Sequence, residues 1–208
     1  MIINIAVAIT GNCGIGLKGG LPWPHLKNDM VLFSKRTTGA GRNAVLMGKN
    51  TWYSIPENRR PLKTRTNIII TRNQMESMSP SPCHVFHSIY DAVTFCEKCG
   101  DYDELWIIGG SGIYNEYLNT NTHYDKVSRV YITYVCGNYE CDTFIHIPVE
   151  SYLIEEKTYN PAENCYYLTC VHKMHANDGK EQGLELLEDF IKYFCCQERD
   201  SSNLRIDS

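Results

Sequence analysis

The sequence contains no long hydrophobic run and no excess of positive charge. Of its 208 residues, 43% are hydrophobic and 21% are charged, values typical of a globular chain with one domain, or one domain and an appendage. The lack of about 18 consecutive apolar residues excludes a membrane-spanning helix. The first residues also lack the basic start and cleavage site of a secretory leader, so we expect a cytoplasmic protein. A net charge of −4 gives no electrostatic footprint for nucleic acid, and we expect no such partner.

The excess of acidic charge lies at the C-terminal end of the chain. Residues 176–208 contain eight acidic and four basic side chains, whereas residues 1–175 are neutral with 16 of each. We therefore expect a domain over 1–175 and an acidic extension over 176–208. A helix is predicted at 184–194, because Leu187, Phe190, Ile191 and Phe194 recur at helical spacing. The alternatives for it are docking on its own domain, dimerisation through residues 183–196, partner binding and a disordered tail; we expect a monomer.

The ten cysteines do not form a strong metal motif. Cys96 and Cys99 have the spacing of metal ligands, but the nearest partner pair, Cys136 and Cys141, is separated by four residues in a strand–loop pattern and lacks the compact knuckle of a metal site. Without a secretory leader, reduced thiols are expected. We predict no metal site.

Apolar runs of strand length alternate with helical patterns along two-thirds of the chain. Strands are predicted at 2–9, 43–47, 66–71, 84–87 and 104–108, and helices from Pro24 to the turn at 37–39, over 48–54, from Ser88 to about Cys99 and from Ser111 to about Leu118. Three later runs, 129–134, 150–157 and 165–173, alternate like antiparallel strands. The predicted fold is α/β, with a mostly parallel twisted central sheet of about eight strands, an antiparallel C-terminal edge and helices on both faces.

The stretch Gly14-Ile15-Gly16-Leu17-Lys18-Gly19 matches the dinucleotide pattern GxGxxG in letters only. That motif opens a helix on its glycines, whereas Leu21-Pro22-Trp23-Pro24 follows here. We interpret the stretch as a mobile glycine-rich loop that approaches a ligand closely, with a plain surface turn as the alternative.

Four predicted strand ends carry groups that bind anions. Gly109-Gly110-Ser111 leaves one strand and opens a helix, whose N–H groups and dipole favour a phosphate. Gly48-Lys49-Asn50-Thr51, Thr71-Arg72 and His87 leave three others. Taken singly, these are a tight turn and solvated surface charges. Together they predict a crevice for a phosphorylated ligand at the carboxyl edge of the sheet.

Asp29 is an acid inside an apolar helical stripe. Leu26, Met30 and Phe33 form the stripe, and Pro24 suits the first helical turn. A buried carboxylate needs a partner, which is either a structural Arg or backbone donor, or a bound ligand. Thr133 could supply a hydroxyl to it, and Arg65 could bind a carboxylate, although a strand threonine and a surface arginine need no such roles.

Many blocks in the same order resemble the dihydrofolate reductase family, over about residues 1–175 and most closely its eukaryotic branch. The blocks are Ala6-Val7-Ala8, Gly14-Ile15-Gly16, Leu21-Pro22-Trp23, Asp29 with Phe33, Met47 to Trp52, Ser54-Ile55-Pro56, Pro61 to Arg65, Trp106 to Gly110 and Asp142-Thr143-Phe144. The resemblance implies NADPH-dependent reduction of 7,8-dihydrofolate to 5,6,7,8-tetrahydrofolate, in support of one-carbon metabolism and thymidylate and purine synthesis. Hydride would pass to C6, and a proton would reach N5 through water.

The resemblance also implies the roles of single residues. The catalytic set would be Asp29, Trp23, Leu21 and Thr133, in which Asp29 grips N3–H and the 2-amino group of the pterin, Thr133 and a water on Trp23 complete the network, and Leu21 belongs to the lid. Dihydrofolate or an antifolate-type inhibitor would contact Ala6, Val7, Asp29, Met30, Phe33, Ser54, Ile55, Arg59, Leu62, Arg65, Ile108 and Tyr114. NADPH would contact Ala8, Ile15, Gly16, Gly19, Gly20, Leu21, Gly48, Lys49, Asn50, Thr51, Thr71, Arg72, Asn73, His87, Ile108, Gly109, Gly110, Ser111, Gly112, Ile113 and Tyr114. A cis peptide is implied between Gly109 and Gly110.

Four residues depart from the family pattern. Asp29 replaces the Glu of eukaryotic members, Met30 replaces an aromatic residue, and Gly20 replaces a polar lid residue. His87 stands where an Arg often contacts the 2′-phosphate, so weaker or pH-sensitive cofactor discrimination is expected. The alternatives to an active reductase are a folate- or nucleotide-binding protein without turnover and a pyrimidine reductase of the same fold.

Overall fold

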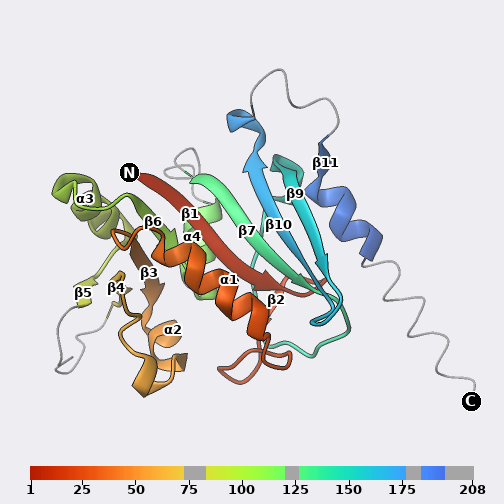
Figure 1. Ribbon diagram of the computed structural model, residues 1–208, viewed down its shortest axis with the longest axis horizontal. Coiled ribbons are helices and arrows are strands. Elements are labelled where there is room, and N and C mark those ends of the chain that lie inside the picture. The colour runs from red at the N-terminus through yellow and green to blue at the C-terminus, as the bar shows by residue number, and fades with distance from the viewer. Residues whose placement is uncertain (73–82, 120–126, 177–183, 195–208) are drawn as a thin grey trace, which may run out of the picture. The chain divides into compact units, whose positions relative to one another are not determined.

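The computed structural model describes residues 1–72, 83–119, 127–176 and 184–194 (Figure 1). The chain divides into two compact units. The first contains residues 1–6 and 26–127, and the second contains residues 7–25 and 128–208. Each unit has its own pattern of strand pairing. The predicted boundary between a domain over 1–175 and an extension over 176–208 does not coincide with these units, and it stays a prediction.

Parallel strands form the sheet of the first unit. Their order is β1-β6-β3-β4-β5, and each neighbouring pair is parallel. The strands are β1 (Ile2–Ile9, of which residues up to Ala6 belong here), β3 (Ala44–Gly48), β4 (Thr66–Ile70), β5 (Cys83–Phe86) and β6 (Glu104–Ile107). Val45, Leu46 and Ile68 are fully buried, as expected of strands covered on both faces. The predicted parallel part of the sheet is confirmed.

Helices connect these parallel strands. They are α1 (Lys27–Thr38), α2 (Lys49–Ser54), α3 (Ile89–Cys99) and α4 (Ser111–Asn119), with a 3-10 turn at Glu57–Arg59. α2 contacts β3 and β4, α3 contacts β4 and β5, and α4 contacts β3. Ser88 caps α3 as predicted, because its Oγ accepts the N–H of Asp91 at 3.1 Å. Gly100 ends that helix in the left-handed conformation, at φ 66°.

The start of α1 differs from the prediction. The helix begins at Lys27, and its N-cap is Leu26, with an extended backbone at φ −91° and ψ 100°. Pro24 is therefore outside the first turn. Each proline disfavours helical geometry in the residue before it, so Pro22 and Pro24 keep this stretch extended, and the buried Leu26 anchors the chain where the helix starts.

Antiparallel strands characterise the second unit. Their order is β11-β9-β10-β7, formed by β7 (Val127–Val135), β9 (Tyr152–Asn160), β10 (Cys165–His172) and β11 (Glu185–Leu186). A second small sheet pairs β2 (Gly14–Gly16) with β8 (Thr143–Phe144). The 3-10 turns are Val149–Ser151 and Lys173–His175. The three predicted C-terminal strands are confirmed, and with the first unit they confirm a mixed α/β fold.

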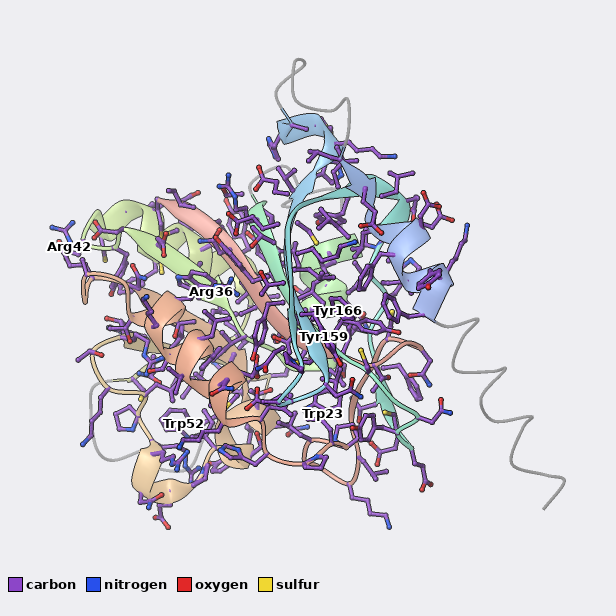
Figure 2. The ribbon with its side chains drawn as sticks, turned by 45° about the vertical axis from the view of Figure 1, so that its right-hand side comes forward. Trp23, Arg36, Arg42, Trp52, Tyr159 and Tyr166 are labelled. Atoms are coloured by element: carbon purple, nitrogen blue, oxygen red, sulfur yellow. The ribbon has the colours of Figure 1, made fainter. Side chains whose placement is uncertain are left out.

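The C-terminal segment packs on strands of its own unit. Residues 187–194 are helical, and Leu187 and Phe190 are buried. The Phe190 ring meets Tyr134 of β7 and Tyr166 of β10, with ring centroids 5.3 and 5.4 Å apart. Figure 2 shows Tyr166 beside Tyr159 of β9, whose ring lies 4.8 Å away. Among the alternatives predicted for this segment, these contacts agree with docking on the strands of the chain itself.

The predicted helix over 184–194 is too long at its start. Glu185 and Leu186 form β11, which pairs with Ile154 and Leu153 of β9. An edge strand has unpaired N–H and C=O groups, and β11 satisfies some of those of β9. An ion pair between Lys157 and Glu185 joins the same two strands. Pairing at this edge therefore overrides the local helical pattern at its first residues.

Other expectations concern disulfides, metals and membranes. None of the eight cysteines within the described ranges forms a disulfide. The same ranges contain no group of three or more His, Cys, Asp or Glu side chains arranged to hold a metal ion. Among the helices of the described residues, none has the length and apolar character needed to cross a membrane.

Candidate functional site

The carboxyl ends of the parallel strands meet at one edge of the first unit, as predicted. Gly48 N–H at the end of β3 donates to Gly109 O beyond β6 at 2.7 Å, and Ile108 N–H donates to Leu46 O at 2.9 Å. At the next two strands, Thr71 N–H donates to Phe86 O at 3.0 Å. The strand ends that carry the predicted phosphate-binding groups are therefore neighbours.

Gly109 and Gly110 form a tight junction between strand and helix. Their peptide bond is cis, which confirms the geometry that the resemblance implies. Gly109 has φ +109°, and a Cβ atom there would lie 2.9 Å from the Tyr114 ring. A Cβ atom at Gly110 would lie 3.0 Å from Thr51 Oγ1. Only glycine fits at Gly109, and the junction brings the starts of α2 and α4 together.

Tyr114 packs against this glycine junction and ties it to β1. Its hydroxyl donates to Ala6 O of β1 at 2.7 Å, and burial raises the pKa of this phenol. Ile113 is also buried, and its side chain lies 3.3 Å from a Cβ placed at Gly48. Ala6, Gly48, Gly109, Ile113 and Tyr114 are thus brought together as the resemblance implies.

The charged and polar groups at this edge differ in exposure. Lys49 and Thr51 are half-buried, Asn50, Arg72, Ser111 and Gly112 are exposed or half-buried, and Thr71 is buried. His87 is exposed, and its Nδ1 lies 2.8 Å from Thr71 O. Because a carbonyl only accepts, Nδ1 carries the hydrogen of this bond. Asn73, predicted to contact the cofactor, lies outside the described residues.

Helix α1 buries two polar residues and no apolar one. They are Asp29, which is 8% exposed, and Thr37, which is fully buried. Met30 and Phe33 are only half-buried on the same helix. A helix that covers nothing but a core would bury its apolar side chains instead. The face of α1 that carries Asp29 is therefore suited to a polar ligand.

Arg65 is held by two hydrogen bonds. Its Nη1 donates to Thr37 Oγ1 at 2.6 Å, and its Nε donates to Lys63 O at 3.1 Å. Burial lowers the pKa of this half-buried guanidinium. A fixed, partly desolvated arginine is well suited to bind a carboxylate.

Sequence reasoning missed Asn67, which lies fully buried in β4. Its Oδ1 accepts Leu62 N–H at 3.0 Å, and its Nδ2 donates to Leu62 O at 2.9 Å and to Arg65 O at 3.0 Å. The side chain therefore fixes the loop that presents Leu62 and Arg65. The available signal was a lone amide in an otherwise apolar strand, next to a proline-rich loop.

The remaining predicted substrate contacts of this unit lie on the following turns. Ile55 and Leu62 are half-buried, whereas Ser54 and Arg59 are exposed. Ser54 Oγ donates to Thr51 O at 2.8 Å, which closes the end of α2. Trp52 of that helix, labelled in Figure 2, is buried. The Arg60 guanidinium lies 5.6 Å from its ring. The Arg60–Pro61 bond before Leu62 is cis.

In the second unit, the glycine stretch is more ordered than a plain loop. Gly14–Gly16 form β2, and Leu17 and Gly20 exchange both backbone hydrogen bonds at 3.0 Å. Asp142 fastens this turn, because its Oδ2 accepts Lys18 N–H at 2.7 Å and its own N–H donates to Gly16 O at 3.0 Å. The Lys18 N–H bond and the Thr143 hydroxyl, which donates to Oδ1 at 2.8 Å, hold the pKa of Asp142 below its usual value. As predicted, no helix opens on these glycines.

The other predicted residues of the second unit are buried or follow that turn. Trp23 is buried, and its ring meets Tyr139 edge to face at 6.1 Å. Thr133 is buried on β7, opposite Tyr167 of β10. Val7 is buried, Ala8 and Ile15 are half-buried, and Gly19, Gly20 and Leu21 are exposed. An exposed leucine after a tight turn is consistent with the predicted lid.

Comparison with known proteins agrees with this geometry. A family model for dihydrofolate reductase matches residues 2–175. The viral dihydrofolate reductase of Saimiriine herpesvirus 2 (strain 488) is 39% identical over 151 residues, which are 69% of this chain and 68% of that protein. The dihydrofolate reductase of Rattus norvegicus is 38% identical over 159 residues, which are 72% of this chain and 82% of that protein. The dihydrofolate reductase of Drosophila melanogaster is 34% identical over 145 residues, which are 68% of this chain and 77% of that protein.

Proposed function

The chain belongs to the dihydrofolate reductase family, and we propose that it reduces 7,8-dihydrofolate to 5,6,7,8-tetrahydrofolate with NADPH. The observation that carries this proposal is the buried carboxylate of Asp29 on a helix that buries no apolar side chain. A carboxylate in such a place matches the edge of a pterin, which presents N3–H and a 2-amino group side by side. We further propose a cytoplasmic monomer that antifolate-type inhibitors also bind.

The residues at the strand ends of the first unit fit a phosphorylated dinucleotide. The starts of α2 and α4 meet there, and Lys49, Arg72 and His87 leave the same edge. Gly48, Thr51, Gly109 and Gly110 would hold the pyrophosphate, the cations Lys49 and Arg72 would hold the remaining phosphate, and His87 would lie beside it. When bound, NADPH supplies the hydride that reaches C6 of the pterin.

The chain itself orients the substrate and controls water. Asp29 holds N3–H and the 2-amino group, and its charge favours the pterin protonated at N5, to which solvent delivers the proton. Thr133 and a water on Trp23 act with it. Arg65 binds the α-carboxylate of the glutamate tail, and Phe33, Ile55 and Leu62 contact the ring systems. Leu21 and the turn at Leu17–Gly20 close over the reacting atoms and exclude bulk water.

Absorbance at 340 nm tests the reaction directly. Purified protein mixed with dihydrofolate and NADPH is expected to oxidise NADPH only when both are present. Reactions with either reagent alone, and with an unreduced pyrimidine base such as uracil in place of dihydrofolate, are the controls. No oxidation with dihydrofolate, or faster oxidation with the pyrimidine, would contradict the proposed function.

His87 is expected to weaken the preference for NADPH over NADH. Its Nδ1 hydrogen is used by Thr71 O, so the neutral ring presents only a lone pair at Nε2, which repels a phosphate oxygen. Replacing His87 by Arg should raise the ratio of kcat/KM for NADPH to that for NADH about tenfold. The measurement is steady-state kinetics with each cofactor at saturating dihydrofolate.

His84→Arg is the matched control for that change. His84 is exposed on β5, the strand that His87 follows, and lies against Phe95, with ring centroids 4.8 Å apart. The His84→Arg substitution adds the same charge at a position that has no contact with Thr71. An unchanged cofactor ratio in His87→Arg, or an equal change in His84→Arg, would exclude a specific role for His87.

A further inference from the structure

Thr37 has an oriented hydroxyl that faces Arg65. Its Oγ1 donates to Phe33 O, one turn earlier in α1, at 2.8 Å. Because that bond uses the only hydroxyl hydrogen, a lone pair remains for Arg65 Nη1, which donates to it at 2.6 Å. The side chain is fully buried, so neither bond competes with solvent. Thr37 therefore fixes the direction of one arm of the guanidinium.

The other parts of Arg65 are fixed as well. Nε donates to Lys63 O at 3.1 Å, and the buried Asn67 accepts from and donates to the loop backbone at Leu62 and Arg65. Backbone and side chain of Arg65 are thus held from separate elements, β4 and α1. Because the backbone and the guanidinium are both held, few conformations of the long Arg65 side chain remain accessible.

These bonds determine which edge of Arg65 a ligand meets. Nε and one N–H of Nη1 are used, and Nη2 makes no hydrogen bond within the described part of the chain. One N–H of Nη1 and both N–H groups of Nη2 stay available to a ligand. A carboxylate accepts a pair of N–H groups with both of its oxygens.

We propose that Thr37, supported by Asn67, is a positioning residue that makes the enzyme select pterins whose tail ends in a carboxylate. The proposal rests on the proposed function, in which Arg65 binds that carboxylate. Thr37 touches Arg65 and not the reacting atoms, so it sets tail recognition and leaves the reaction at the pterin ring unchanged.

A substitution pair separates positioning from general damage. Thr37→Val keeps the shape and removes the hydroxyl, Thr37→Ser keeps the hydroxyl, and Thr37→Ala is the second variant if valine prevents folding. Thr38→Val is the matched control, because among the described residues the Thr38 hydroxyl contacts only Thr64 Oγ1, at 3.5 Å. Each variant is assayed with NADPH and either dihydrofolate or 6,7-dimethyl-7,8-dihydropterin, which has no glutamate tail.

Thr37→Val is expected to raise KM for dihydrofolate about tenfold, with kcat and the KM of the tail-less pterin within about twofold of wild type. Thr37→Ser should restore KM, and Thr38→Val should leave it unchanged. Equal rises in both KM values, no rise at all, or a failure of serine to rescue would overturn the proposal.

Binding measured without turnover keeps this test independent of the proposed function. Quenching of tryptophan fluorescence gives Kd for folic acid and for pterin. The ratio of Kd for pterin to Kd for folic acid should fall about tenfold in Thr37→Val, because only the binding of folic acid weakens. A wild type that binds both but oxidises no NADPH contradicts the function alone. A ratio that stays at the wild-type value contradicts the role of Thr37.

Discussion

Replacing Asp29 by asparagine is expected to lower kcat for dihydrofolate reduction by at least about 100-fold. Asn keeps the size of the side chain and one acceptor oxygen but removes the charge. The pterin edge is then bound by a neutral group, and the protonated form at N5 loses its electrostatic support. Because Asp29 is 8% exposed, water cannot replace the missing charge effectively. The assay is absorbance at 340 nm with saturating NADPH and dihydrofolate.

The loss should appear in kcat as well as in KM. An interaction that strengthens in the transition state lowers both kcat and kcat/KM, whereas uniform binding changes KM alone. Asp101→Asn is the control, since Asp101 is exposed in the turn after α3 and the same atoms change. Equal kcat values for wild type and Asp29→Asn would remove Asp29 from the mechanism, and a change in KM alone would reduce it to a binding residue.

Local patterns predicted the elements that depend on neighbouring residues. The Ser88 cap follows from a hydroxyl three residues before the N–H that it accepts, and the parallel strands follow from apolar runs between helical patterns. Asp29 stood out because a helical stripe is a periodic signal within one segment. Such features need no knowledge of distant contacts.

The features that were missed depend on residues far apart in the sequence. Asn67 matters because a preceding loop folds back on it, and nothing in its own strand indicates which groups its amide will meet. The turn at Leu17–Gly20 is fastened by Asp142, which no local pattern links to those glycines. Likewise, β11 exists because β9 offers an edge. Sequence periodicity reports a preferred local conformation, and tertiary pairing decides the exceptions.

Phe190→Ala should lower the free energy of unfolding by about 3 to 5 kcal/mol. The ring is 1% exposed and lies between Tyr134 and Tyr166, and the Lys157 ammonium lies 5.5 Å from its centroid. Its removal leaves a cavity under the helix at 187–194 that the two tyrosines cannot fill without breaking the pairing of β7 with β10. Urea unfolding followed by circular dichroism gives the change.

Tyr193→Ala is the matched control on the same helix. Tyr193 is 59% exposed, so its loss should change the unfolding free energy by less than about 1 kcal/mol. A large effect at Phe190 with a small one at Tyr193 means that the C-terminal helix stabilises the fold by covering the β7–β10 surface. Equal small effects would mean that the helix does not dock in solution. A dilution-dependent loss of stability, with a change of size in gel filtration, would instead assign the helix to dimerisation.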